Sequence, residues 1–303
     1  MLPTRHGSIH LFRVAGLNVW LHWSWFVIAM LEISYRRGSY ASLSWNVLEY
    51  VALFVIVLLH EMGHAFACRS VGGQADEIVL WPFGGVAYVA PPVRPGATLW
   101  SIAAGPLVNV VLFIPLSLVL VWGGMTDWMQ AAPDAMKFVQ AVWGTNLLLL
   151  GFNILPIYPL DGGQILRSLL WFALGRARSL LVASIVGFIG VPVLFLVAWW
   201  MQSLWLALLA VLIVSLCWRG LQQARQLARV AALPRRAGFQ CPSCETAPPI
   251  GAWWVCGRCG KPFDTFETAA VCPHCGAQFS GTRCLDCGTM HAMDEWRQPP
   301  PVL

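Results

Sequence analysis

Residues 51–64 read Val-Ala-Leu-Phe-Val-Ile-Val-Leu-Leu-His-Glu-Met-Gly-His, an apolar run that ends in two histidines with a glutamate between them. The uncharged stretch 51–59 predicts a membrane-buried helix, in which His60 and His64 lie one turn apart on the same face. Two imidazoles so placed can bind one zinc ion, and Glu61 lies beside them where it can reach a water molecule. Polar side chains deep in an apolar helix are costly, which favours a functional metal site over two structural histidines.

Two imidazoles leave a catalytic zinc ion one protein ligand short. Among the acidic residues before Arg219, only Glu61 and Asp161 lie away from predicted loops and helix ends. Asp161 lies in residues 153–163, Asn-Ile-Leu-Pro-Ile-Tyr-Pro-Leu-Asp-Gly-Gly, where prolines break a helix and glycines free the backbone. Broken helices of this kind hold ligand sites in the middle of membranes. We therefore expect Asp161 to be the third ligand, a role that is compatible with its capping a helix over 162–174.

The composition predicts an α-helical polytopic membrane protein, since 58% of the 303 residues are apolar and 11% are charged, against roughly 25% charged in a soluble domain. No removed signal peptide is expected. The region 74–89, around Pro82-Phe83-Gly84-Gly85, predicts a small membrane-associated β hairpin or re-entrant loop. Six stretches are long enough to span a bilayer: Leu17–Ile33, Val47–Cys68, Leu99–Trp122, Phe138–Leu155, Leu180–Trp200 and Leu204–Trp218.

Charge asymmetry orients these spans, because basic residues are enriched on the cytoplasmic side of membrane proteins. Arg36 and Arg37 lie on the opposite side, with Lys137 a weaker exception. We expect both termini in the cytoplasm, on the side of a larger basic set: Arg5, Arg13, Arg69, Arg94, Arg167, Arg176, Arg178 and the run 219–236.

The C-terminal region carries four Cys-x-x-Cys pairs, a spacing typical of zinc knuckles in a reducing compartment. The spacing predicts two successive zinc ribbons, the first two pairs holding one structural zinc and the last two another, although crossed pairing stays open. The pairs are Cys241 with Cys244, Cys256 with Cys259, Cys272 with Cys275, and Cys284 with Cys287.

These features divide the chain into a membrane domain (1–218), a basic linker (219–238), a tandem zinc-ribbon domain (239–297) and a tail (298–303). The ribbon region has more acidic than basic residues, and each four-thiolate zinc site adds negative charge. Nucleic acid is therefore an improbable partner, and we expect a protein partner for the ribbons. The basic linker is expected to contact anionic lipid headgroups.

The sequence resembles the site-2 protease family of intramembrane zinc metalloproteases, from about residue 10 to about residue 220. The motifs that carry the resemblance are His60–His64, Asn153-x-x-Pro156-x-x-Pro159-Leu-Asp161-Gly162, Gly84-Gly85, and Gly105-Pro106-Leu107-Val108-Asn109. The resemblance implies that Glu61 is the catalytic acid and base and that the substrate is a membrane-spanning protein. It implies a catalytic zinc held by His60, His64 and Asp161. The chain has no room for the PDZ insertion of many members, and it carries zinc ribbons where some have cystathionine-synthase-type domains.

Three questions stay open from the sequence. Asn109 and Asn153 are polar residues in predicted spans, where they contact either neighbouring helices or the substrate. An exposed strand edge within Ile78–Val89 is expected to hold an unwound substrate by strand addition. The alternative function is a non-proteolytic zinc-binding scaffold or transporter. Glu61 argues against a scaffold, and the presence of a single His/Glu cluster in the spans argues against a transporter.

Overall fold

The structure, a computed structural model, describes residues 7–81 and 84–297. Four parts of the sequence predictions lie outside the described residues: Arg5, Pro82, Phe83 and the tail 298–303.

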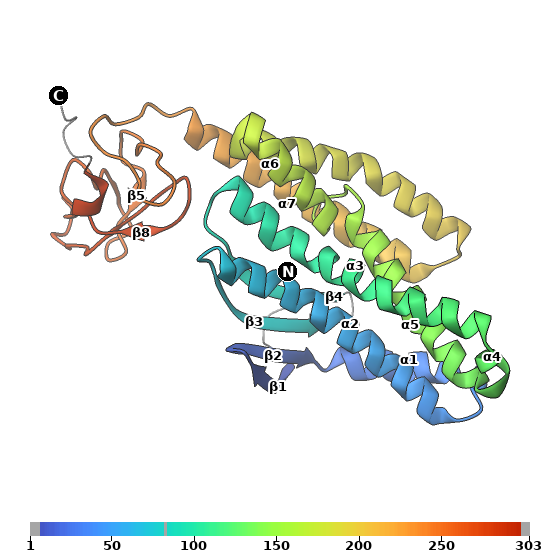
Figure 1. The fold of residues 1–303 in the computed structure, drawn as a ribbon. Helices are drawn as coiled ribbons and strands as arrows, with labels where there is room; N and C mark the ends of the chain where they lie inside the picture. The colour runs from blue at the N-terminus through green and yellow to red at the C-terminus, as the bar shows by residue number, and fades with distance from the viewer. Residues whose placement is uncertain (1–6, 82–83, 298–303) are drawn as a thin grey trace.

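The membrane domain is a helix bundle with a small sheet against one side, as Figure 1 shows. Among the described residues, four helices are long and apolar enough to cross a membrane: α2 (Leu43–Ser70), α3 (Pro95–Met125), α6 (Asp161–Trp200) and most of α7 (Leu204–Ala231). The remaining helices are α1 (Ser24–Tyr35), α4 (Trp128–Ala131) and α5 (Pro133–Ile154). The predicted class of helical membrane protein is confirmed.

The second, third, fifth and sixth of the six expected stretches fall on these four helices, whereas the first and fourth fall on other elements. Residues Leu17–His22 form a strand, and α1, with 12 residues, is about 18 Å long, shorter than a bilayer core of roughly 30 Å. Helix α5 has 22 residues but is interrupted by polar side chains, including Asn146 and Asn153. Among its described residues only Met136 and Asn146 are buried, and apolar side chains such as Leu148 are exposed.

The sheet has the strand order β1-β2-β3-β4, with β1 (Ser8–Val14), β2 (Leu17–His22), β3 (Gln74–Trp81) and β4 (Gly84–Ala90). Strands β3 and β4 are the expected hairpin, antiparallel and paired from Gln74↔Ala90 to Trp81↔Gly84. Strands β1 and β2 were not predicted, although β2 buries every second residue, as a strand with one covered face does. The core between sheet and helix α2 joins Ile78 and Leu80 to Ala65 and Cys68.

Helix α6 is broken at Gly175, where φ is 74° and ψ is 171°. Its first half matches the helix expected over 162–174. The second half packs against α7 after a turn at 201–203, so the two form a tight helical hairpin. Helix α7 continues to Ala231, so the first part of the expected basic linker is helical.

The C-terminal module lies at the end of the bundle where α3 begins and α7 ends (Figure 1). It consists of two short hairpins, β5 (Trp254–Val255) with β6 (Pro262–Phe263) and β7 (Thr282–Arg283) with β8 (Met290–His291). A 3-10 turn, η1 (Asp294–Trp296), follows them. Cysteines and aromatic side chains such as Phe266 and Trp296 fill its small core.

Candidate metal centres

Three potential metal ligands from two helices converge inside the membrane domain. His60 and His64 lie on α2 and are 3% and 5% exposed, and Asp161 is the first residue of α6. The Nε2 atoms of the two histidines are 3.1 Å apart, and the Asp161 Oδ2 lies 3.0 Å from that of His60 and 3.3 Å from that of His64. The structure therefore brings together the three residues expected to bind the catalytic zinc.

The hydrogen bonds of the two imidazoles fit a metal centre. The other ring nitrogen of each points away from the cluster: His64 Nδ1 lies 2.9 Å from the carbonyl oxygen of Ser101, and His60 Nδ1 lies 2.6 Å from Oδ1 of Asn109. Zinc-binding histidines commonly donate their second nitrogen in this way, which directs the lone pair of the first toward the metal. Two nitrogens and one carboxylate oxygen form a donor set typical of catalytic zinc sites.

The approach of Asp161 to the histidines depends on the glycine that follows it. A Cβ atom at Gly162 would lie 2.1 Å from the carbonyl oxygen of Ile154, at the end of α5. Only glycine lets the first turn of α6 pack this closely against α5. Gly162 is thus required for the packing of α6 against α5, in addition to giving the backbone freedom inferred from the sequence.

Glu61 lies between α2 and the sheet and is 6% exposed. Its Oε2 accepts a hydrogen bond of 2.8 Å from the backbone amide of Ala87 in β4. Strand β4 therefore fixes the carboxylate beside the two histidines.

The two asparagines named from the sequence differ in their surroundings. Asn109 is fully buried, and its side chain contacts His60 and Asn146 of α5, which is the contact between helices that was one of the two expected alternatives. Contact of Asn109 or Asn153 with a substrate stays a prediction. Asn153 is half-buried near the end of α5. Asn146 was missed, although it is polar in an apolar helix and lies seven residues, about two turns, before Asn153.

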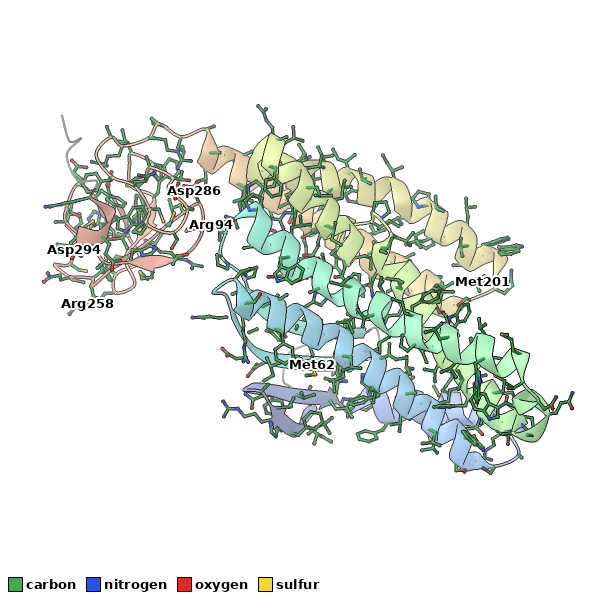
Figure 2. The ribbon with its side chains drawn as sticks, viewed as in Figure 1. Met62, Arg94, Met201, Arg258, Asp286 and Asp294 are labelled. Atoms are coloured by element: carbon green, nitrogen blue, oxygen red, sulfur yellow. The ribbon has the colours of Figure 1, made fainter. Side chains whose placement is uncertain are left out.

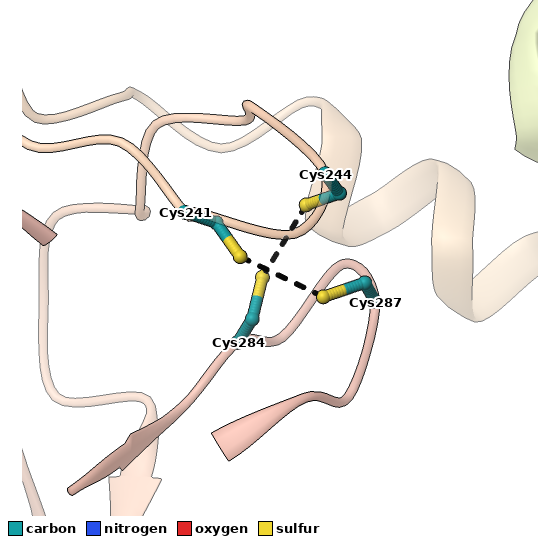
Figure 3. A group of neighbouring side chains, drawn as sticks. All are labelled: Cys241, Cys244, Cys284 and Cys287. Carbon is teal, nitrogen blue, oxygen red and sulfur yellow. Dashed lines mark hydrogen bonds between the residues drawn. The ribbon is translucent and has the colours of Figure 1, made fainter. Parts of the chain in front are cut away.

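The eight cysteines of the C-terminal module form two groups, but their pairing is nested rather than successive. The outer group, shown in Figure 3, joins the first and last pairs: Cys241, Cys244, Cys284 and Cys287. The inner group joins the middle pairs: Cys256, Cys259, Cys272 and Cys275. The pairing of neighbours along the chain is therefore wrong, because loop lengths do not specify which knuckles meet in space.

All four knuckles share one backbone geometry. In each, the residue after the second cysteine has a left-handed conformation, with φ between 59° and 83°, and its amide donates a 2.9 Å hydrogen bond to the carbonyl of the first cysteine. Cross-knuckle sulfur distances are 3.6–3.7 Å. A hydrogen bond from Cys284 lowers the pKa of Cys244 to about 5, and the backbone amide of Cys259 lowers the pKa of Cys256 to about 6. The lowered pKa of these two thiols favours the thiolate, the form that binds zinc.

Comparisons with known proteins agree with this architecture. The model of peptidase family M50 matches residues 49–135 and 123–197. A zinc metalloprotease of Methanocaldococcus jannaschii is 32% identical over 182 residues, which are 59% of this chain and 50% of that protein. Stage IV sporulation protein FB of Bacillus subtilis is 31% identical over 122 residues, 38% of each. The chain spans about half the length, or less, of these curated relatives.

The solved structure of a site-2 protease from Methanocaldococcus jannaschii is similar to the fold, with a TM-score of 0.50 and 28% identity. The match covers 71% of this chain and 95% of that one. Apolar helices around two buried imidazoles and a carboxylate define a membrane metalloprotein. The chain belongs to peptidase family M50, the site-2 protease family, and carries a C-terminal pair of zinc ribbons.

A substitution at Gly105 tests the position of the membrane metal centre. A Cβ atom there would lie 2.3 Å from Nε2 of His64 and 2.8 Å from that of His60, whereas a Cβ at Gly124 of the same helix meets nothing within 4 Å. We expect Gly105→Ala to lose the membrane zinc, measured as zinc per purified chain, while Gly124→Ala keeps it. Equal zinc contents in the two variants would contradict the assignment.

Thiol protection tests the nested pairing. We expect Cys241→Ser to expose Cys244, Cys284 and Cys287 to an alkylating reagent, because loss of one ligand weakens zinc binding by its group. The matched variant Cys256→Ser should expose Cys259, Cys272 and Cys275 instead. Mass spectrometry of the alkylated peptides reads the result, and exposure of Cys256 and Cys259 in Cys241→Ser would restore the successive pairing.

Proposed function

We propose that the protein is an intramembrane zinc metalloprotease that cleaves membrane-spanning segments of protein substrates. The observation that carries the proposal is the convergence of His60, His64 and Asp161 within a bundle of apolar helices, with the carboxylate of Glu61 fixed beside them. The names of its relatives, which include a zinc metalloprotease, support zinc as the metal.

The chemistry divides between the metal and Glu61. When bound, zinc supplies Lewis acidity that polarises a peptide carbonyl and makes water acidic enough to ionise near neutral pH. Glu61 accepts the proton of the attacking water and then delivers it to the leaving amine. The Ala87 amide holds the carboxylate in position for both transfers.

The sheet offers a way to present the substrate. A helical segment hides its carbonyl groups in its own hydrogen bonds, so it must unwind before cleavage. Strand β3 is paired on both sides, so the expected edge within Ile78–Val89 is narrowed to β4, the last strand in the order. A peptide added beside β4 passes Glu61, because the amide of Ala87 points from that edge to the Glu61 carboxylate.

We also propose that the C-terminal module lies in the cytoplasm and controls access to the site. Basic side chains gather near it, including Arg94 and Arg176, which supports a cytoplasmic orientation. A cleft of about 600 Å³ lies between the module and three parts of the membrane domain: the start of α3, the region around the break in α6 and the end of α7. A flanking segment of a protein substrate is the partner we expect there, rather than nucleic acid.

One knuckle joins the module to the membrane domain. In Figure 2, Asp286 lies at the junction of the two, whereas Asp294 lies on the outer side of the module. The carboxylate of Asp286 accepts hydrogen bonds of 2.7 Å and 3.1 Å from Arg235, and its backbone oxygen accepts one from Arg176, next to the break in α6. Because Asp161 begins α6, this contact links the outer cysteine group to the helix that carries a proposed zinc ligand.

A transporter is the weaker alternative. Within the described residues, the groups of three or more potential ligands are the membrane centre and the two cysteine groups of the module. A relay of ligands across the membrane, which transport would need, is not among them.

Glu61→Gln tests the protease directly. We expect this variant to keep zinc and fold but to lose a factor of about 100 to 10,000 in cleavage of a membrane-spanning substrate, because an amide cannot accept the proton. Cleavage is measured in detergent or liposomes against the unchanged protein. Full activity in Glu61→Gln would reject the proposed role.

Asp286→Ala tests the control by the module, with Asp294→Ala as its matched control. We expect Asp286→Ala to retain zinc in both cysteine groups but to speed hydrogen exchange around residue 175 and to change the rate or choice of cleavage. Loss of the carboxylate removes both bonds to Arg235 and loosens the knuckle whose backbone oxygen accepts from Arg176. Asp294→Ala should change neither the hydrogen exchange nor the cleavage. If both variants behave alike in exchange and cleavage, the module does not act through α6.

A further inference from the structure

Two buried asparagines connect His60 to the neighbouring helices. Asn109 of α3 and Asn146 of α5 are both fully buried. Oδ1 of Asn109 lies 2.6 Å from Nδ1 of His60, and Nδ2 of Asn109 donates to Oδ1 of Asn146 at 2.8 Å. Nδ2 of Asn146 donates in turn to the backbone oxygen of Asn109 at 2.9 Å.

The direction of every bond in this chain follows from its last member. A backbone carbonyl can only accept, so the atom of Asn146 that faces it must be the amide nitrogen. The oxygen of Asn146 is then left to accept from Asn109, whose own oxygen must face His60. His60 Nδ1 therefore carries the hydrogen, and the lone pair of Nε2 is free on the side of Asp161 and His64.

His64 also carries its hydrogen on Nδ1, but without an intervening side chain. Its Nδ1 contacts the backbone oxygen of Ser101 directly, at 2.9 Å. A main-chain carbonyl thus sets the tautomer of both imidazoles, directly for His64 and through two amides for His60.

We propose that Asn146 is a positioning residue that fixes the metal-binding tautomer of His60 through Asn109. This inference rests on the proposed zinc site and deepens it. Without Asn146, the amide of Asn109 is free to turn and donate to Nδ1 of His60, which moves the hydrogen to Nε2 and blocks the lone pair that the metal needs.

The same helix pair supplies a control for simple packing. We call the chain of hydrogen bonds from Asn146 through Asn109 to His60 the relay. Trp143 of α5 donates a 2.9 Å hydrogen bond to Ser117 of α3, a second polar contact between these helices. Neither of its two residues belongs to the relay. If Asn146 only held the two helices together, loss of either contact would have the same effect on zinc binding. The relay predicts that only Asn146 affects zinc.

The test measures zinc retained by the full chain during titration with a chelator at several pH values. The variant His60→Ala supplies the baseline of ribbon zinc. We expect Asn146→Leu to weaken membrane zinc binding about 10- to 100-fold, the usual effect of removing an outer partner of a zinc-binding histidine. Ser117→Ala should stay within about threefold of the unchanged protein, below that range.

Two further variants keep the test decisive. Asn109→Leu interrupts the relay at its centre and should lose as much zinc affinity as Asn146→Leu. It supplies the same test if Asn146→Leu folds poorly. Asn146→Asp should restore binding, because a carboxyl buried between apolar helices stays protonated and can both donate to the Asn109 carbonyl and accept from its amide. A loss of zinc in Asn146→Asp equal to that in Asn146→Leu would overturn the proposal.

The outcomes also separate this inference from the proposed function. If the unchanged protein holds no more zinc than His60→Ala, the membrane zinc site itself fails. If it does hold that zinc, but Asn146→Leu binds as tightly as Ser117→Ala, the site stands and the relay is rejected.

Discussion

The constraint on which the structure depends is that polar atoms inside a membrane must find partners within the protein, because lipid offers none. A pair of imidazoles and two carboxylates on helices α2 and α6 can exist there only with such partners. Helix α3 supplies the Ser101 carbonyl and Asn109, and strand β4 supplies an amide to Glu61. The bundle and its sheet thus provide hydrogen-bond partners for the buried side chains of the candidate site.

This constraint also explains which parts of the site the sequence could reveal. His60, Glu61, His64 and Asp161 are conspicuous because ionisable residues are rare in apolar helices. Asn146 is less conspicuous, since an amide in a helix is equally compatible with ordinary helix packing, and its meaning depends on a contact between α3 and α5 that no local pattern encodes.

The fold shows the same division between local and distant information. The hairpin β3–β4 and the break before Asp161 follow from nearby glycines and prolines. Strand β2 was hidden because its apolar residues run on into α1, and the two segments together resemble one membrane span. The parallel pairing of β2 with β3 joins segments more than fifty residues apart, which periodicity alone cannot predict.

The nested arrangement of the cysteines gives the C-terminal module an order of assembly. The inner knuckles enclose a short loop, whereas the outer group joins residues 241 and 287 at the two ends of the module. Closing the inner loop first shortens the free chain between the outer knuckles and lowers the entropy lost in joining them. On a ribosome, the outer ion can be enclosed only after Cys287 has been synthesised. The contacts of Asp286 with Arg176 and Arg235 then form last. A nascent chain therefore inserts its helices before the module packs against them.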